Sequence, residues 1–461
     1  MMASTFSHDV IALLRRNRRL LGGASLYLGE RLIASVLSLV VFVLLARLYS
    51  PAEYGMWAFT LGIMQFAAAF LVSAAEPIVV RQLLQSNSSR HAVMGSAALV
   101  IGVTSVLALV LPLGFILIWY RDNPVVMTIG LLYALACVPN FLLVLEYHLR
   151  AQERALELSR ARFVAVVLGA ALKIILALQG VPIQWLAAIL PIEICVQVAI
   201  LWMSVRNEKP KQPRWRVDMK LARSLLWACL PAMLAAVLVT LFFRINYLLL
   251  ERLSNFEQVG FYALAFSVLQ IVLMVPSVAM SALYPRLCDL FTRDVKRFSS
   301  VFHWLYFGAA AFGYACTLLV FLFGKPIVEW GFGSKYLESV PTLIVMFLAL
   351  SVLATGVVRA SVINILQVQR LHVWSAAIGL VLLIPISIAA IRIWGATGAA
   401  IGILISGAAS CTFSSFLFPQ LRSHARSQVL ALLLLSPFFS PLTPSVLKTA
   451  TAGPPEGPPA A

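Results

Sequence analysis

Four cations lie within long apolar runs of this sequence, where a charged side chain needs a specific reason to be present. They are Arg31, Lys173, Arg244 and Arg359. An ionisable group at the centre of a membrane-spanning helix costs about 2.5–3.5 kcal/mol on insertion scales. Guanidinium groups donate paired hydrogen bonds to phosphate oxygens, and lysine supplies a compact positive charge. The four cations therefore predict a site for a phosphate-bearing anion.

Two carboxylates offer a structural alternative for the first two cations. Glu76 lies at about the depth of Arg31, and Glu193 lies at about the depth of Lys173, so that hairpin ion pairs would explain both. Long basic side chains that reach the membrane surface would explain them as well. No comparable acid is evident for the other two, and we therefore expect Arg244 and Arg359 to be the first substrate contacts.

Uncharged polar side chains in the apolar runs add three further candidates. Gln65 and Gln270 occupy equivalent positions in the two halves of the sequence, and Asn246 lies two residues after Arg244. In a hydrated cavity such amides would hydrogen-bond sugars. Hydrogen bonding between helices is the alternative, because polar side chains often hold membrane helices together.

The elements that carry these residues are predicted to be membrane-spanning helices. The chain has 461 residues, of which 61% are hydrophobic and only 11% charged, too few to cover a water-soluble globule. A span needs about 20 mostly apolar residues. Twelve such runs begin near Leu26, Trp57, Val93, Thr128, Phe163, Trp185, Leu225, Phe261, Phe302, Thr342, Ser375 and Ala396. The sequence predicts an all-α polytopic membrane protein.

The two halves of the sequence repeat each other. Residues 44–65 return as residues 249–270, with the same leucines, arginine, glycine, alanine and glutamine at corresponding places, and Arg81 has the same spacing from Arg286. Six spans in each half give the halves the same orientation, because an even number returns the chain to its starting side. We predict two parallel six-helix lobes that are related by pseudo-symmetry around a central cavity.

Basic residues set the expected topology. With the N-terminus inside, 24 of the 35 Lys and Arg residues fall on the cytoplasmic side. The formal net charge of +17 therefore reflects the membrane topology rather than binding of nucleic acid. Both termini are predicted to be cytoplasmic. The expected regions are a basic N-terminus (1–25), an N-lobe (26–203), a basic linker (204–224), a C-lobe (225–420), and a cytoplasmic or interfacial, partly disordered tail (421–461).

One sequence motif resembles a known family. The pattern R-L-x-x-P-x-E-Y-G-x-x-A, which runs from Arg47 to Ala58, is similar to the polysaccharide transporter family of oligosaccharide flippases. Similar pieces lie at 260–263, 284–286, 333–336 and 395–400, so that the resemblance covers most of residues 25–420. It implies the two-lobed fold of the multidrug and oligosaccharidyl-lipid exporter superfamily. Family members often carry an acid near Asn246, which this chain lacks.

The resemblance also implies a function. The expected substrate is an oligosaccharide linked to a polyprenyl pyrophosphate, moved by alternating access from the cytoplasmic to the outer leaflet for surface polysaccharide synthesis. The expected location is the bacterial cytoplasmic (inner) membrane. Membrane lipids, a polysaccharide polymerase and chain-length machinery are the expected partners, and no nucleic acid, metal, cofactor or enzymatic bond-making is implied.

Other chemistries lack the residues they need. The sequence has no Walker-type Gly-x-x-x-x-Gly-Lys segment for ATP, no paired-carboxylate site for glycosyl chemistry, and no metal-ligand spacing among its six histidines, which we expect at surfaces or span ends. A multidrug or cation antiporter on the same fold is the alternative. A cavity for cationic cargo should contain acidic side chains, and only Glu76 and Glu193 are evident within the spans. A membrane glycosyltransferase or polymerase would need a larger outer loop, whereas a structural subunit of a polysaccharide assembly complex stays open.

Overall fold

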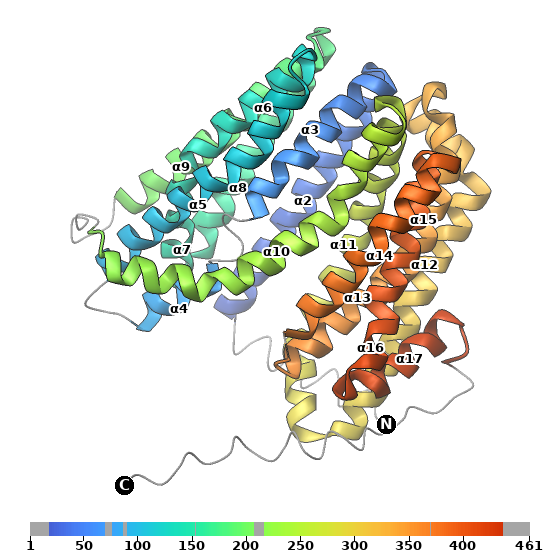
Figure 1. Ribbon diagram of the computed structural model, residues 1–461. Coiled ribbons are helices and arrows are strands. Elements are labelled where there is room, and N and C mark those ends of the chain that lie inside the picture. Colours follow the sequence, from blue (N-terminus) through green and yellow to red (C-terminus); the bar gives the residue numbers. More distant parts are fainter. Residues whose placement is uncertain are drawn as a thin grey trace. The chain divides into compact units, whose positions relative to one another are not determined.

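The computed structural model describes residues 18–69, 76–85, 90–152, 154–206, 216–368 and 370–436, and within these ranges the chain is helical and contains no strand (Figure 1). Twelve long segments follow one another, as the sequence predicted. They are α2 (Arg18–Leu48), α3 (Pro51–Ala69), α5 (Arg90–Trp119), Pro124–Ala151, α8 (Ala155–Leu178), Ile183–Arg206, α10 (Met219–Leu253), α11 (Phe256–Arg293), α12 (Val295–Phe332), Ser334–Ile365, α14 (Arg370–Trp394) and Ala396–Leu417. Nine of these described helices are long and apolar enough to cross a membrane.

Several segments contain irregular turns. The fourth consists of α6 (Pro124–Cys137), a 3-10 stretch (Val138–Leu143) and α7 (Val144–Ala151), and the break contains Pro139, which lacks the N–H that a regular helix would use. The sixth and tenth begin with 3-10 turns before α9 (Ile189–Arg206) and α13 (Val340–Ile365). The twelfth divides into α15 (Ala396–Ala408), a π-turn (Ala409–Phe413) and α16 (Ser414–Leu417). Such π-turns are frequent at functional sites.

The chain folds into two compact units. Unit 1 comprises residues 1–49 and 60–237, and unit 2 comprises residues 50–59 and 238–461. One division falls inside α3 and one inside α10, and the third falls in the short loop between α2 and α3. As a result, the first turns of α3 pack with the second half of the chain.

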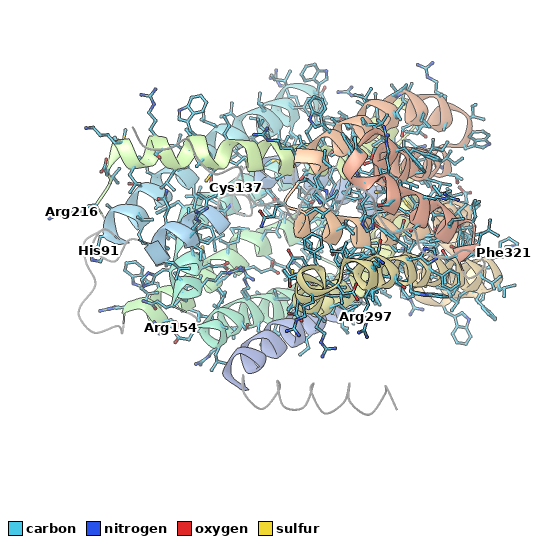
Figure 2. The ribbon with its side chains drawn as sticks, turned by 90° about the horizontal axis from the view of Figure 1, so that it is seen from below. His91, Cys137, Arg154, Arg216, Arg297 and Phe321 are labelled. Carbon is cyan, nitrogen blue, oxygen red and sulfur yellow. The ribbon has the colours of Figure 1, made fainter. Side chains whose placement is uncertain are left out.

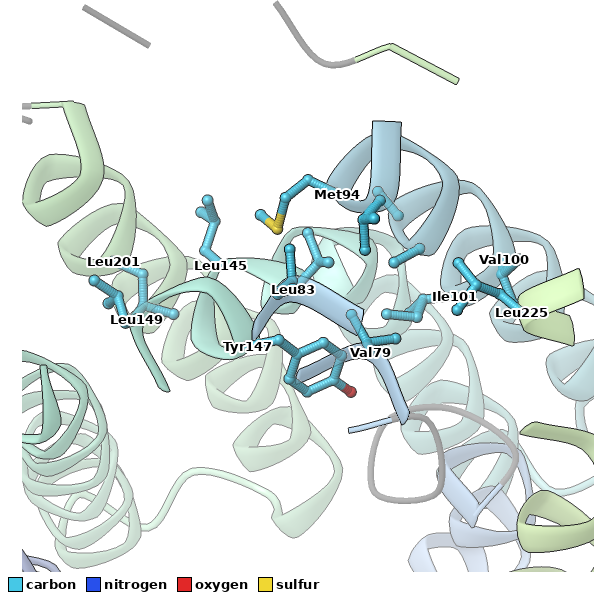
Figure 3. Packing of buried hydrophobic residues seen from close by; sticks show 14 of the residues in the cluster. Val79, Leu83, Met94, Val100, Ile101, Leu145, Tyr147, Leu149, Leu201 and Leu225 are labelled. Atoms are coloured by element: carbon cyan, nitrogen blue, oxygen red, sulfur yellow. The ribbon is translucent and has the colours of Figure 1, made fainter. Parts of the chain in front are cut away.

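The core of unit 1 lies where α4 (Glu76–Gln85), α5, α7, α9 and the first part of α10 meet (Figure 3). Val79, Leu83, Ile101, Tyr147 and Leu201 are all at most 2% exposed there. Buried side chains from these helices, Tyr147 among them, form one hydrophobic cluster. This packing fixes α7 against its neighbours and so fixes the polar residues that α7 carries.

The start of α10 is tied to α5 within unit 1. The backbone N–H of Arg216 donates to the carbonyl of His91 at 3.4 Å, and the two residues lie side by side in Figure 2. Asp218 and Ser96 exchange two hydrogen bonds of 3.0 and 3.1 Å. Gly95 permits this approach, because a Cβ there would lie 2.3 Å from the Arg216 carbonyl oxygen. The end of the basic linker is therefore anchored.

Corresponding helix starts in the two sequence repeats are capped in similar ways. Ser50 precedes α3 and forms a capping box with Glu53: the Ser50 N–H donates to the Glu53 carboxylate at 2.8 Å, and the Glu53 N–H donates to Ser50 Oγ at 3.3 Å. Asn255, which lies 205 residues later, caps α11 by accepting the Gln258 N–H at 2.9 Å. The repeat in sequence is thus a repeat in local structure.

The same two helix starts cross within unit 2 at repeat-related glycines. A Cβ on Gly55 would lie 1.8 Å from the carbonyl oxygen of Phe256, and a Cβ on Gly260 would lie 2.0 Å from that of Pro51. Phe256 stands in the second repeat where Pro51 stands in the first. The contact is therefore reciprocal, and it explains in steric terms why both repeats carry glycine at this position.

The short helix α17 (Arg422–Leu432) packs against α12 and α13 in unit 2. Gln428 donates to the Thr355 hydroxyl at 2.9 Å, and the Tyr314 hydroxyl donates to the Leu432 carbonyl at 2.8 Å. Two histidines, His303 and His424, are buried in this region, which corrects the expectation that they lie at surfaces. The packing of α17 against α12 covers both rings. The burial of these histidines depends on tertiary contacts and therefore could not be predicted from the residues next to them in sequence.

The outward face of α12 is strongly apolar. Phe321 lies at the edge of unit 2 (Figure 2) and Trp330 lies near the end of the same helix, and both side chains are mostly exposed. Such large exposed apolar side chains over a long helix fit a lipid environment. The chain is a multi-pass membrane protein.

Candidate substrate-binding site

Arg244 is half-buried on α10 within unit 2, and aromatic rings surround its guanidinium group. The guanidinium carbon lies 5.2 Å from the ring centroid of Phe266 and 5.5 Å from that of Tyr247, whose hydroxyl also accepts from Nη1 at 3.2 Å. Cation–π contacts of this kind contribute about 0.5–2 kcal/mol and leave the charge in place. Among the described residues no carboxylate forms an ion pair with Arg244.

The rings around Arg244 form a continuous group, here called the aromatic cage: Tyr247, Tyr262 and Phe266. Tyr247 meets Tyr262 edge to face at 5.3 Å, and Tyr262 stacks on Phe266 at 5.9 Å. Tyr247 also meets Phe266 edge to face at 6.2 Å. The cage therefore combines rings from α10 and α11 inside unit 2, and sequence reasoning missed it because the rings come from two different helices.

Asn246 is fully buried and links helices within unit 2. Its Nδ2 donates to the Ala399 carbonyl at 3.0 Å and approaches the Tyr262 hydroxyl at 3.4 Å. These contacts join α10 to α11 and α15. Asn246 therefore holds helices together, which is the alternative to sugar binding that the sequence left open. Its Oδ1 is buried without a hydrogen-bond partner among the described residues. Asn246 holds the backbone that carries Arg244, two residues earlier.

Arg359 on α13 is also without a carboxylate partner in the described part of the chain, but it is 4% exposed. Its Nε donates to Ser415 Oγ at 2.6 Å, and its Nη2 donates to Ser375 at 2.7 Å and to Ser414 at 3.2 Å. The π-turn places the two adjacent serines of α16 toward one guanidinium. Arg359 is therefore a buried cation that hydroxyl groups solvate, and it is poorly placed to touch a bulky headgroup.

Lys173 forms the ion pair that the sequence offered as an alternative. Its Nζ lies 2.6 Å from Glu193 Oε1, across the contact between α8 and α9 in unit 1. Gly169 makes the pairing possible, because a Cβ there would lie 1.7 Å from the same carboxylate oxygen. The two side chains are 16% and 21% exposed, so that the positive charge is neutralised where it is buried.

A second buried ion pair in unit 1 was missing from the sequence analysis. Glu146 on α7 is 3% exposed and accepts hydrogen bonds from Arg162 on α8 and from Gln197 on α9. It is an acid within the fourth segment, which corrects the count of only Glu76 and Glu193. The partners lie 16 and 51 positions away, and a lone glutamate three positions after the end of the 3-10 stretch gave no signal for them.

The remaining candidates have less defined surroundings. Gln65 is half-buried on the part of α3 that belongs to unit 1, and Gln270 is exposed on α11 in unit 2. The side chains of Arg31 and Glu76 lie outside the described residues, so that their expected pairing stays a prediction. Within the described ranges no group of three His, Cys, Asp or Glu side chains could hold a metal ion.

A comparison with protein families decides the class of the chain. The profile of the family described as polysaccharide biosynthesis protein matches residues 44–341. The chain belongs to this family. No curated protein matches the sequence. The family resemblance that the Arg47–Ala58 motif indicated is thereby confirmed.

Solved structures identify the fold of this family member. A structure of the lipid II flippase MurJ in an inward closed conformation is similar at a TM-score of 0.70 and 12% identity, over 92% of this chain and 95% of that one. An inward-facing multidrug resistance MATE transporter of the MOP superfamily gives 0.68 and 14%, over 91% and 96%. A Vibrio cholerae MATE transporter gives 0.51 and 17%, over 93% and 99%. The MATE-like fold class predicted from the sequence is confirmed.

Proposed function

We propose that this protein is a flippase that moves oligosaccharides linked to polyprenyl pyrophosphate from the cytoplasmic to the outer leaflet for surface polysaccharide synthesis. Membership of the polysaccharide biosynthesis family and the MurJ-like fold support this proposal. The observation that carries it is Arg244, a half-buried cation that aromatic rings hold in place without neutralising it. We further propose that the protein lies in the bacterial cytoplasmic membrane with both termini inside. Its proposed protein partners are a polysaccharide polymerase and chain-length machinery.

Arg244 is suited to a pyrophosphate because its charge is fixed but not cancelled. Its contacts use the Nη1 atom and the faces of the guanidinium, so that other N–H groups keep their capacity to donate. Charge-assisted hydrogen bonds from guanidinium to phosphate are about twice as strong as neutral ones. In the half-buried setting the attraction is screened less than at an exposed surface. We assign Arg244 to the pyrophosphate and the cage to its orientation.

Alternating access would reorganise the start of α3. These turns belong to the first sequence repeat, yet they pack with unit 2 through Gly55 and Gly260. The predicted topology puts this crossing on the outer side. We propose that the crossing closes the outer side of the site while the headgroup enters from the cytoplasm, and that its separation releases the headgroup outward. No bond in the substrate forms or breaks in this cycle, so that the protein is not an enzyme.

The second candidate is a multidrug or cation antiporter, which the similarity to MATE transporters favours. A site for a cationic cargo needs an available carboxylate. Glu146 and Glu193 are each paired with a basic side chain in the described part of unit 1. Arg244 would in addition repel a cation. The charges therefore favour an anionic substrate.

The test uses a strain that lacks the gene and is complemented with wild type, Arg244→Ala or Arg244→Lys at matched membrane abundance. We expect Arg244→Ala to lower surface polysaccharide about tenfold, because one charge-assisted contact is lost, while the lipid-linked precursor accumulates on the cytoplasmic side. Lysine should restore part of the loss. Arg293→Ala is the matched control, since this α11 side chain is 76% exposed and its one ion pair among the described residues is with Asp289.

Either of two results would contradict the proposal. Normal surface polysaccharide in the strain without the gene would exclude an essential flippase role, and altered drug sensitivity in that strain would favour the antiporter. Equal losses with Arg244→Ala and Arg293→Ala would mean that positive charge in general, and not Arg244, supports the activity.

A further inference from the structure

An exposed apolar turn follows α17 in unit 2. Leu433, Leu434 and Leu435 are 61%, 44% and 38% exposed. Three consecutive exposed leucines on a turn are unfavourable in water, where turns are normally polar. The turn therefore indicates an apolar medium around these side chains.

The backbone of this turn gives the same indication. Leu434 has a φ of +56°, in the left-handed region that a Cβ disfavours. Its N–H donates to the Ala431 carbonyl at 3.0 Å, and the Leu435 N–H donates to the Leu430 carbonyl at 2.8 Å. This pair of bonds is a Schellman motif, in which the left-handed residue is usually glycine and sometimes asparagine. Contact with lipid is a physical reason for a strained leucine at this position.

Two tryptophans of α12 indicate the level of the membrane surfaces. Trp304 and Trp330 are 52% and 82% exposed and lie 26 positions apart, which is about 39 Å along a helix. Tryptophan is enriched at both membrane–water interfaces, and a bilayer with its headgroup regions is about 40–45 Å thick. Trp304 therefore lies near one surface, on the side that the sequence predicts to be cytoplasmic.

Contacts of α17 with α12 place the leucine turn below that surface (Figure 1). The Tyr314 hydroxyl donates to the Leu432 carbonyl at 2.8 Å, and Tyr314 lies ten positions, or about 15 Å, further along α12 than Trp304. His303 Nε2 lies 3.1 Å from the Ser436 carbonyl oxygen, so that the chain is back at the surface four residues later. The segment therefore enters the membrane and returns to the same side.

Two exposed cations lie near the start of this segment. Arg422 and Arg426 are four positions apart on α17, so that they share one face of the helix. Arg422 Nε donates to the Phe416 carbonyl at 3.1 Å, at the end of the twelfth segment. Neither arginine forms an ion pair with a carboxylate in the part of the chain that the structure describes. Guanidinium groups at the end of a span are at the level of lipid phosphates, to which they donate paired hydrogen bonds.

We propose that residues 422–436, here called the lipid wedge, bind anionic phospholipids of the surrounding leaflet. Leu433, Leu434 and Leu435 lie among the acyl chains, and Arg422 and Arg426 bind the phosphate groups. Apolar insertion and basic residues together anchor a segment more firmly than either does alone. The lipid wedge is distinct from Arg244, and its binding of bilayer lipid does not depend on whether the protein is a flippase.

The experiment measures the apparent Tm of the purified full-length protein in detergent micelles with increasing phosphatidylglycerol or phosphatidylcholine. We expect phosphatidylglycerol to raise the Tm at lower concentrations, because it binds the folded state more tightly. Arg422→Gln combined with Arg426→Gln should raise the phosphatidylglycerol concentration required about thirtyfold, or about fivefold for each arginine. The matched control, Lys220→Gln with Arg223→Gln, removes two exposed cations from α10 in unit 1 and should leave the response unchanged.

Two variants test the leucine turn. Asparagine suits the left-handed backbone better than leucine, so that Leu434→Asn would stabilise a turn that lies in water. We expect it instead to weaken the response to phosphatidylglycerol about threefold, whereas the apolar Leu434→Met should preserve the response.

Four results would overturn the proposal. They are equal responses to the two lipids, an arginine double variant that responds like its control, an unchanged response in Leu434→Asn, and a rise in Tm with inorganic phosphate or a soluble acidic peptide that matches the rise with phosphatidylglycerol. The last would make the arginines a site for a soluble anion or a protein. Leu434→Asn keeps the test decisive even where the arginine variant fails to fold.

Discussion

Units 1 and 2 treat positive charge inside the membrane in opposite ways. In unit 1 two cations of α8 have carboxylate partners: Lys173, within the fifth span, pairs with Glu193, and Arg162, just before that span, pairs with Glu146. In unit 2 the two cations of the spans have none among the described residues, and rings or hydroxyls surround them instead. Two halves that repeat each other in sequence have therefore diverged in electrostatics.

The difference separates structural charge from functional charge. A paired cation is neutral as a unit and holds two helices together, whereas an unpaired cation keeps its field and attracts an anion. Burial then divides the unpaired ones further, since Arg244 is half-buried and Arg359 is 4% exposed. The first is exposed enough to meet a large headgroup, whereas serine hydroxyls enclose the second.

The largest expected effect on stability follows from breaking the pair around Glu146. Glu146→Gln leaves Arg162 without its anion and should lower the free energy of unfolding by about 3 kcal/mol, because removing one partner exposes the desolvation cost of the other. Thermal unfolding of the purified protein measures it. Adding Arg162→Gln should recover part of the loss. A single variant as stable as wild type would show that unit 1 does not depend on paired charges.

The next effect concerns the more exposed pair. Lys173→Met should cost about 1–2 kcal/mol, because Glu193 loses its cation but keeps some contact with solvent. Combining it with Glu193→Gln should restore stability and leave transport near the wild-type level. Transport that is lost in both the single and the double variant would instead place Lys173 among the substrate contacts and would break the contrast between the units.

Much of this arrangement could be predicted from the sequence. Twelve apolar runs predicted the twelve segments, because span length is set by membrane thickness. The absence of acids near Arg244 and Arg359 predicted their unpaired state, and Glu193 was recognised at the depth of Lys173. Glu146 was missed, because its partners come from two other helices that only tertiary packing brings to it.

The aromatic cage and the serines beside Arg359 could not be predicted for a similar reason. Tyrosine and serine are common in membrane helices, and their meaning depends on which helix face they occupy. The π-turn of residues 409–413 rotates Ser414 and Ser415 relative to a regular helix, and nothing in the composition of that run indicates the turn. The same holds for α17, whose contacts with α12 bury His424.

The smallest expected effect depends on pH and concerns His424, which lies outside the twelve segments. Burial among Phe298, Phe302 and Tyr306 lowers the pKa of this imidazole from 6.5 to about 4. The unfolded chain therefore takes up a proton first as pH falls, so that stability is lost progressively from about pH 6.5 down to about pH 4. At pH 5.5 the loss is about 1.4 kcal/mol.

His424→Phe should remove this part of the pH dependence of stability. The variant thereby tests whether unit 2 buries polar groups without acidic partners. The difference in apparent Tm between wild type and His424→Phe should change between pH 7 and pH 5, with the variant losing less on acidification. Parallel curves for the two proteins across this range would mean that the ring is accessible to protons in the folded state.

The most direct test of the central claim compares one cation from each unit in vesicles that contain only this protein. A fluorescent polyprenyl-pyrophosphate-linked sugar is supplied to one leaflet, and its appearance in the other is measured over time. We predict that Arg244→Gln slows translocation about tenfold, whereas the charge-neutral double variant Lys173→Met, Glu193→Gln translocates at nearly the wild-type rate. Normal translocation with Arg244→Gln, together with loss in the double variant, would contradict the account.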